Sequence, residues 1–163
     1  MRFVLALAAV SVLAIAPFSA ANAQTAPTPD MKTFASSADV QALIANARKL
    51  RKPGQPSVVQ PLLSLAPYRA NLEYRPAVGP AAVHEKDAEF FYIIDGSGTL
   101  VTGGKLTQET RTNPNNLSGA GIEGGESRQV AKGDFIVVPQ NTPHWFSAIN
   151  GELILMSLHV PRG

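Results

Sequence analysis

The sequence predicts an all-β fold, a small barrel or two-sheet sandwich preceded by one helix. From residue 57 onward, short apolar or alternating segments recur between turn signals made of Gly, Pro and Asn, which is the pattern of such folds. Only residues 36–52 show apolar residues at convincing helical spacing. The chain contains no cysteine, so disulfides cannot stabilise it and its stability must come from packing.

Residues 1–23 have the pattern of a secretory signal peptide. Arg2 precedes an apolar run over residues 3–18, and three small residues, A-N-A, lie just before Gln24. A membrane anchor is the alternative, but the apolar run is short for a span and Pro17 interrupts it. We therefore expect cleavage before Gln24, export to a bacterial periplasm or beyond, and no membrane association after cleavage.

The exported chain is predicted to be one domain with a short leading arm. Residues 24–34 are polar and rich in proline, which indicates a flexible linker. Residues 35–163 suffice for a single domain, which begins with the helix over residues 36–52. Ser36 is the expected helix cap, with Asp39 as its capping-box partner. The apolar stripe expected to pack on the domain consists of Val40, Leu43, Ile44 and Ala47.

Charge and composition exclude several classes of function. The formal net charge is +2, and the basic residues are scattered except for one group within residues 48–52. That group falls in the last turn of the predicted helix, where it would complement the helix dipole. This distribution argues against binding to nucleic acid or to anionic membranes. The lack of cysteine excludes thiolate nucleophiles and Cys-ligated zinc.

Residues 81–96 are the first stretch that carries chemistry. If residues 81–85 form a strand, Ala82 and His84 point to the same face. A turn over residues 86–88 would bring Glu89 back beside His84. From Glu89 the chain is apolar on both faces, as in a strand buried between two layers, and Asp95 and Gly96 are expected to supply the next turn. One imidazole and one carboxylate can therefore converge in a pocket.

Residues 133–150 are the second such stretch. Gly133 begins a turn, residues 135–138 form a buried strand, and a proline-rich corner over residues 139–143 leads to His144 at the start of the next strand. A histidine held after such a corner is rigid and can face a pocket. A histidine among apolar residues is usually a hydrogen-bonded core residue, but two such segments in one chain favour a site.

The two segments together resemble the two motifs of the cupin superfamily, which are small jelly-roll β-barrels that hold a metal inside. In the second motif Gly133, Pro139 and His144 stand at the family spacing, while Asn141 replaces a glycine. This change is tolerable because Asn adopts positive φ more readily than other non-Gly residues. The motif's final Asn falls on Ala148 and is not carried over.

The first motif is incomplete, because its first histidine falls on Ala82. His84, Glu89 and Gly96 match its second histidine, its glutamate and its closing glycine. The resemblance covers residues 68–160 and implies a metal site formed by His84, Glu89 and His144. Two imidazoles and one carboxylate can hold one divalent ion such as Fe, Mn, Ni or Zn. The alternative is that the site is too weak to fill.

The resemblance implies a metal-dependent enzyme acting on a small organic substrate, of dioxygenase, isomerase or lyase type. The alternative is a non-catalytic cupin that binds a small-molecule ligand with a degenerate metal site, and the fold does not choose between them. Cupins commonly pair through sheets that are apolar on both sides, so a homodimer is expected under either hypothesis. Catalytic residues other than the metal ligands stay unknown.

Several residues near the predicted pocket are left open. His159 could be an extra ligand, although nothing in its spacing ties it to the other three. Glu73 and Arg75 share one face of their strand, so Arg75 could face an anionic substrate or form a surface ion pair with Glu73. Phe91, Ile93 and Phe146 are assigned to the inner face, and Tyr92 to the opposite one. Residues 113–125 are predicted to be a Gly/Asn-rich loop, either a lid or a plain insertion.

Overall fold

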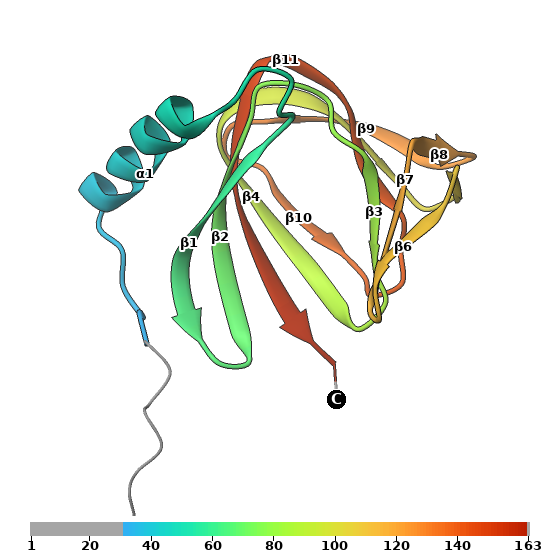
Figure 1. Cartoon of the computed structure of the whole chain (residues 1–163), viewed down its shortest axis with the longest axis horizontal. Helices are drawn as coiled ribbons and strands as arrows, with labels where there is room; N and C mark the ends of the chain where they lie inside the picture. The colour runs from blue at the N-terminus through green and yellow to red at the C-terminus, as the bar shows by residue number, and fades with distance from the viewer. Residues whose placement is uncertain (1–30, 163) are drawn as a thin grey trace, which may run out of the picture.

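The computed structural model of the protein describes residues 31–162, so the predicted signal peptide at residues 1–23 lies outside it. This part of the chain is mostly strand, with one helix near its start (Figure 1), which confirms the predicted all-β fold with an N-terminal helix. No helix of the described residues has the length and apolar character needed to cross a membrane. The elements are α1 (Ser37–Leu50), β1 (Val58–Leu65), β2 (Tyr68–Arg75), β3 (Ala81–His84), β4 (Asp87–Thr102), β5 (Lys105–Thr107), β6 (Thr110–Asn113), β7 (Asn116–Gly119), β8 (Gly121–Glu123), β9 (Glu126–Ala131), β10 (Phe135–Val138) and β11 (His144–Pro161).

Helix α1 starts where its capping box predicts. The Ser36 hydroxyl accepts a hydrogen bond from the Asp39 backbone N–H, and the Asp39 carboxylate accepts one from the Ser36 backbone N–H. Ile44 and Ala47 are buried against a cluster from β1, β2 and β11 that includes Leu72. The helix is thus held to one side of the β-sheet by the predicted apolar stripe (Figure 1).

Two long antiparallel strands, β4 and β11, form the centre of the fold. They are paired along nearly their whole length, with Thr102 beside His144 at one end and Asp87 beside Pro161 at the other. At the Asp87 end, the strand order is β1-β2-β11-β4-β10. At the Thr102 end, it is β6-β7-β3-β11-β4-β9. The strands curve around a common interior (Figure 1), so residues on their concave face converge.

Gly96 marks the place where β4 bends. The predicted turn at Asp95 and Gly96 is wrong, because β4 continues through both residues to Thr102. Gly96 has φ +82°, and a Cβ atom there would collide with the backbone carbonyl of Glu152 on β11. Glycine is therefore required for the close approach of the two strands at their bend.

Residues 113–125 are a second correction, because they are not a loop. Asn116–Gly119 form β7, which pairs with β3, and Gly121–Glu123 form β8, which pairs with β5. The glycines that suggested a loop instead permit close contacts between neighbouring strands of the two sheets. A Cβ atom on Gly119 would lie 2.7 Å from the Thr107 carbonyl oxygen. The lid hypothesis is therefore unsupported, since the segment is fixed by strand pairing.

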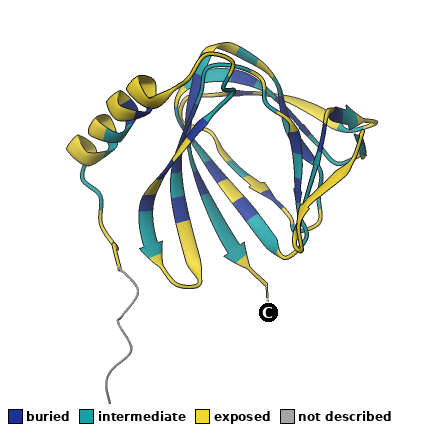
Figure 2. Ribbon diagram, viewed as in Figure 1, coloured by how far each residue is buried: buried dark blue, intermediate teal, exposed yellow. Residues whose placement is uncertain are grey.

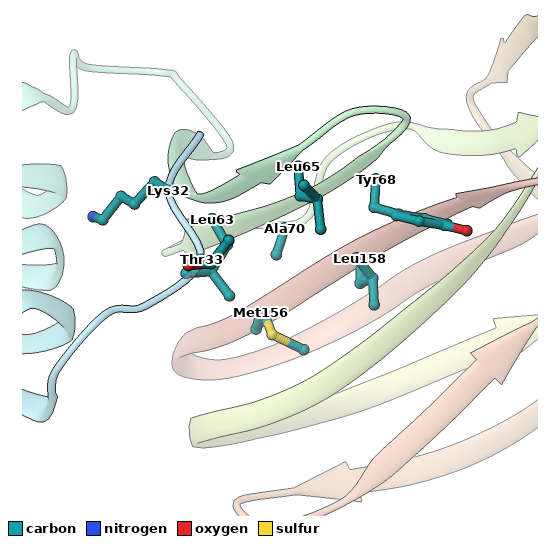
Figure 3. A pocket seen from close by; sticks show the side chains of 8 residues that line it. All are labelled: Lys32, Thr33, Leu63, Leu65, Tyr68, Ala70, Met156 and Leu158. Carbon is teal, nitrogen blue, oxygen red and sulfur yellow. The ribbon is translucent and has the colours of Figure 1, made fainter. Parts of the chain in front are cut away.

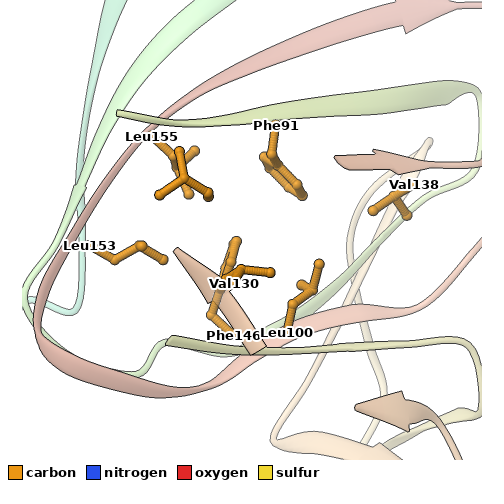
Figure 4. Packing of buried hydrophobic residues seen from close by; sticks show 8 residues of the cluster. Phe91, Leu100, Val130, Val138, Phe146, Leu153 and Leu155 are labelled. Atoms are coloured by element: carbon orange, nitrogen blue, oxygen red, sulfur yellow. The ribbon is translucent and has the colours of Figure 1, made fainter. Parts of the chain in front are cut away.

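The interior is filled by apolar side chains from four strands, β4, β9, β10 and β11. Figure 2 shows where buried residues lie along the strands, and Figure 4 shows the packed cluster. Phe91, Ile93 and Phe146 belong to this cluster, as predicted. Tyr92 faces the other way, with its ring centroid 4.6 Å from that of Phe135. The remaining members of the cluster are Leu100, Val130, Val138, Leu153 and Leu155.

The outer face of the sheet near β10 is also apolar but exposed. Phe135 is 81% exposed, and Phe90 and Val137 are 41% and 54% exposed. Together with Met156 and Leu158 they line an open hollow. Met156 and Leu158 also border a neighbouring hollow, walled by Leu65 and Tyr68 of β1 and β2 (Figure 3). An apolar surface this continuous is typical of an interaction face.

Candidate metal centre

Three strands bring four side chains to one place inside the fold. His84 ends β3, Glu89 lies near the start of β4, and β11 contributes His144 at its first residue and His159 near its end. His159 is the direct cross-strand neighbour of Glu89, and His144 is that of Ala82. Side chains of directly opposed residues share a face, and His84 shares the face of Ala82. The four groups therefore converge on one side of the sheet.

Glu89 lies at the centre of this cluster. Its Oε2 atom is 3.3 Å from His84 Nε2 and 3.1 Å from His144 Nε2, while its Oε1 atom is 3.3 Å from His159 Nε2. The imidazole centroids of His84 and His159 are 4.7 Å apart, and those of His84 and His144 are 5.3 Å apart. One ligand atom each from His84, Glu89 and His159 lie within 4.8 Å of one another. His144 stands just outside that group of three but contacts the same carboxylate.

The Nε2 atoms of these histidines face Glu89 because their Nδ1 atoms are engaged elsewhere. His84 Nδ1 is 3.0 Å from the Asn116 side-chain oxygen, and His144 Nδ1 is 3.2 Å from the backbone oxygen of Thr142. His159 Nδ1 is 3.7 Å from an Asp87 carboxylate oxygen. An acceptor at Nδ1 places the proton there and leaves a lone pair on Nε2. The rings of His84 and His144 can therefore present a ligand atom to the space around Glu89, whereas the Asp87 contact of His159 is too long to fix its proton.

Without a bound cation, the cluster contains a buried carboxylate whose negative charge is not neutralised. Glu89 is 4% exposed, and its Oε2 atom has no hydrogen-bond partner among the described residues. Burial raises the pKa of Glu89, but the nearby His144 and His84 outweigh it and hold the pKa well below its usual range. The buried carboxylate is therefore ionised. A buried anion that faces imidazole lone pairs requires a cation, either a proton or a metal ion.

The histidines respond to this carboxylate in different ways. Burial lowers the pKa of His84, yet the nearby Glu89 carboxylate and the contact with Asn116 leave it raised overall. Burial lowers the pKa of His159, and the attraction of Glu89 does not restore it. His159 is thus the imidazole better suited to remain neutral and ligating, while His84 holds a proton more readily in the absence of a metal.

The nitrogen–oxygen distances around Glu89 match those between two ligands of a single divalent ion. Metal–ligand bonds to His nitrogen and carboxylate oxygen are about 2.0–2.2 Å. Two such ligands on one ion, at octahedral or tetrahedral angles, are therefore separated by roughly 2.9–3.6 Å. The three nitrogen–oxygen separations of 3.1–3.3 Å around Glu89 fall in this range. A set of imidazoles and one carboxylate suits iron, manganese, nickel or zinc.

The structure brings together all three residues that the sequence predicted, His84, Glu89 and His144, and their role as ligands stays a prediction. It adds His159, which the sequence left aside. The signal was present in the alternation of β11, where Leu153, Leu155 and Ser157 are fully buried on the face that His159 continues. Irregular pairing of β11 with β4 between Ile149 and Leu153 shifts this alternation relative to His144, so simple counting from His144 could not reveal it.

A second polar group lies further along the same inner face. The Glu73 carboxylate accepts a hydrogen bond from Ser157 Oγ at 2.7 Å and one from Arg75 Nε at 2.8 Å. Arg75 also lies over the ring of Phe146, with its guanidinium carbon 5.2 Å from the ring centroid. Both alternatives for Arg75 were therefore partly right. The side chain faces the interior, but its charge is already paired with Glu73.

Comparison with known proteins identifies the fold independently. The family model described as Cupin matches residues 59–160, and no curated protein sequence matches the chain. The structure of KdgF from Halomonas sp. is 18% identical, with TM-score 0.50, covering 69% of this chain and 87% of that one. The structure of Fe(II) HppE is 16% identical, with TM-score 0.52, covering 68% of this chain and 54% of that one.

The cupin domain of Schizosaccharomyces pombe Cnp3 is also similar. It is 13% identical, with TM-score 0.48, and the match covers 71% of this chain and 72% of that one. These identities are too low to carry an activity from one protein to another. The match of the family model over most of the described chain, together with the strand arrangement, shows that the chain belongs to the cupin family.

Proposed function

We propose that the protein is an exported cupin that holds one divalent metal ion through His84, Glu89, His144 and His159 and uses it on a small organic substrate. The observation that carries this proposal is the buried Glu89 Oε2, which lacks a hydrogen-bond partner among the described residues while two imidazole Nε2 atoms face it. A metal ion satisfies the carboxylate and the lone pairs at once. His159 would supply the imidazole that the family motif loses at Ala82.

A metal held here would polarise a substrate oxygen or activate dioxygen or water. The protein's own residues define the surroundings of that chemistry. Asn116 and the Thr142 carbonyl fix the rings of His84 and His144. Phe91 packs beside His144, with ring centroids 6.0 Å apart, and forms an apolar wall on the interior side of the site. Such a wall limits water around the ligands and strengthens electrostatic interactions there.

The reaction would be of dioxygenase, isomerase or lyase type. The similar structure titled Fe(II) HppE holds Fe(II) in the same fold, which supports iron as one suitable metal. A non-catalytic cupin that binds a small ligand is the second candidate, favoured by the absence of a ligand at Ala82. The two candidates differ in whether the protein converts a substrate, and the measurement of metal content below applies to both.

Metal content tests the proposal directly. The mature chain, produced from residue 24 onward, is purified without a metal-binding tag and analysed by plasma mass spectrometry after exposure to iron, manganese, nickel and zinc. We expect about one ion per chain, with loss in Glu89→Ala and in each single His→Ala variant at 84, 144 and 159. A wild-type protein that stays empty with all four metals would refute the proposal. Retention by the His159→Ala variant alone would reduce the set to the three ligands of the sequence prediction.

Export and self-association complete the proposal. The pattern of residues 1–23 supports secretion to the periplasm or beyond. The exposed apolar face around Phe135 and Val137 supports a homodimer, in which a second copy of the chain covers this surface. Fractionation of a bacterial expression host, followed by sequencing of the N-terminus of the exported chain, tests secretion. The light-scattering mass of the purified protein tests the homodimer.

A further inference from the structure

A cleft beside the metal centre contains polar side chains that the proposed metal site does not use. It has a volume of about 280 Å³ and lies between β1 and β2, lined by Pro61, Leu63, Ser64, Arg69 and Asn71. Arg69 is the direct cross-strand neighbour of His159 on β11 and of Ser64 on β1. Asn71 is that of Ser157. The strand order β2-β11-β4 therefore places the cleft next to His159 and one strand further from Glu89.

The alternation of β2 puts these groups on the interior side. Tyr68 and Ala70 line the outer hollow together with Leu65 (Figure 3). Successive residues of a strand face opposite sides, so Arg69 and Asn71 face the side that carries Glu73. That side is the interior, because Glu73 is 5% exposed and bonded to the buried Ser157.

Arg69, the cation of this cleft, forms no ion pair with the described residues. Arg75, the other arginine on this face of β2, pairs with Glu73. Among the ion pairs of residues 31–162, none involves Arg69. No side-chain hydrogen bond within the described residues uses Arg69 or Asn71. The cleft thus presents a guanidinium and an amide without partners, and the Ser64 hydroxyl lies directly opposite Arg69.

We propose that Arg69 binds the carboxylate of a small organic acid. An oxygen of another group of the same acid, such as a hydroxyl or a second carboxylate, reaches the metal held by His159 and Glu89. This inference rests on the proposed function and gives its substrate a chemical class. Neighbouring strands are about 4.8 Å apart, so the Arg69 backbone lies roughly 10 Å from that of Glu89, with His159 between them. The long arginine side chain shortens this gap to the length of a small molecule. A planar guanidinium binds a carboxylate through two parallel hydrogen bonds.

Paired acids and amides test the proposal. Binding of lactate and lactamide, and of malonate and malonamide, is measured by titration calorimetry on cobalt-loaded and on EDTA-treated protein. Each amide has the same heavy-atom skeleton as its acid, with NH2 in place of one carboxylate oxygen, and lacks the negative charge. We expect wild type to bind each acid at least about tenfold more tightly than its amide, as a charge-assisted pair requires. Arg69→Gln should reduce this preference severalfold in both preparations while its metal content stays unchanged.

Arg128→Gln is the matched control, because it removes one positive charge from an exposed pair with Glu126 on β9. It should keep the full preference for acids. Arg69→Lys keeps the charge but loses the planar fork, so an intermediate preference is expected. Equal affinity of wild type for acid and amide, or a preference that survives in Arg69→Gln, would overturn the proposal even if the metal is present. An empty metal site with an Arg69-dependent preference in EDTA-treated protein would refute the metal centre and the contact of the acid with it, and would leave only the binding of the carboxylate by Arg69.

Discussion

Replacing Asn116 by alanine should weaken metal binding without touching a ligand. Its side-chain oxygen lies 3.0 Å from His84 Nδ1 and holds the ring with Nε2 facing Glu89. Loss of such a supporting hydrogen bond typically costs 10–100-fold in metal affinity, which corresponds to about 1.4–2.7 kcal/mol. His84 is partly buried, with 19% of its side chain exposed, so water replaces the bond only in part. We therefore expect an effect within this range.

The neighbouring Asn115 provides the control. Its side chain takes part in no hydrogen bond among the described residues, whereas its backbone oxygen accepts one from Glu85 that the substitution leaves in place. Affinities for zinc and cobalt are measured by competition with a chromophoric chelator, and thermal unfolding of the metal-free proteins shows that the fold is intact. Asn116→Asp should preserve or increase affinity, since a carboxylate is a stronger acceptor for the imidazole N–H. Equal affinities for Asn116→Ala, Asn115→Ala and wild type would refute the proposed orientation of His84.

Three further predictions concern the fold and the surface. Gly96→Ala should lower the free energy of unfolding by more than about 2 kcal/mol. Gly133→Ala, at φ +94° with open space around it, should lower it by only about 1–2 kcal/mol. Denaturant titration compares the two variants, and equal losses would contradict the close approach of the strands at Gly96. Hydrogen bonds with Ser36 lower the pKa of the Asp39 carboxyl. Its contribution to stability is therefore full above the ordinary pKa of 3.8 and disappears as the pH falls through the pKa of the folded state. Asp39→Asn should remove this part of the acid dependence of the melting temperature. If the protein forms the proposed homodimer, Phe135→Lys should lower the light-scattering mass to that of a monomer with little change in melting temperature. A dimeric mass that stays unchanged in the variant would place the interface elsewhere.

Local signals in the sequence predicted much of the fold and the main site residues. The helix start followed from the Ser36 and Asp39 capping box, because that motif depends only on residues three positions apart. Asn141 adopts φ +57°, as its replacement of a glycine required. The convergence of His84 and Glu89 followed from one strand, one turn and the next strand. The capping box and the approach of His84 to Glu89 each span fewer than ten residues, over which strand and helix periodicity is preserved.

The errors arose where a residue's role depends on a distant strand. Gly96 looked like a turn glycine, but its reason lies at Glu152 on the neighbouring strand. Gly119 looked like part of a loop, but its reason is the close approach of the Thr107 carbonyl on β5, a strand that does not pair with β7. His159 stayed an open alternative because its partnership with Glu89 depends on the register between β11 and β4, which shifts at the bend. The alternation of residues within one strand does not show how that strand is aligned with its neighbour.

Strand β11 has one consequence for the dynamics of the site. It carries His144 at its first residue and His159 near its end, so two of the four imidazole and carboxylate groups depend on the last strand of the chain being in place. Local opening of β11 would remove both imidazoles together, and a bound ion would oppose that opening at both ends of the strand. Slow amide exchange along β11 would then report metal occupancy more directly than the stability of the whole domain does.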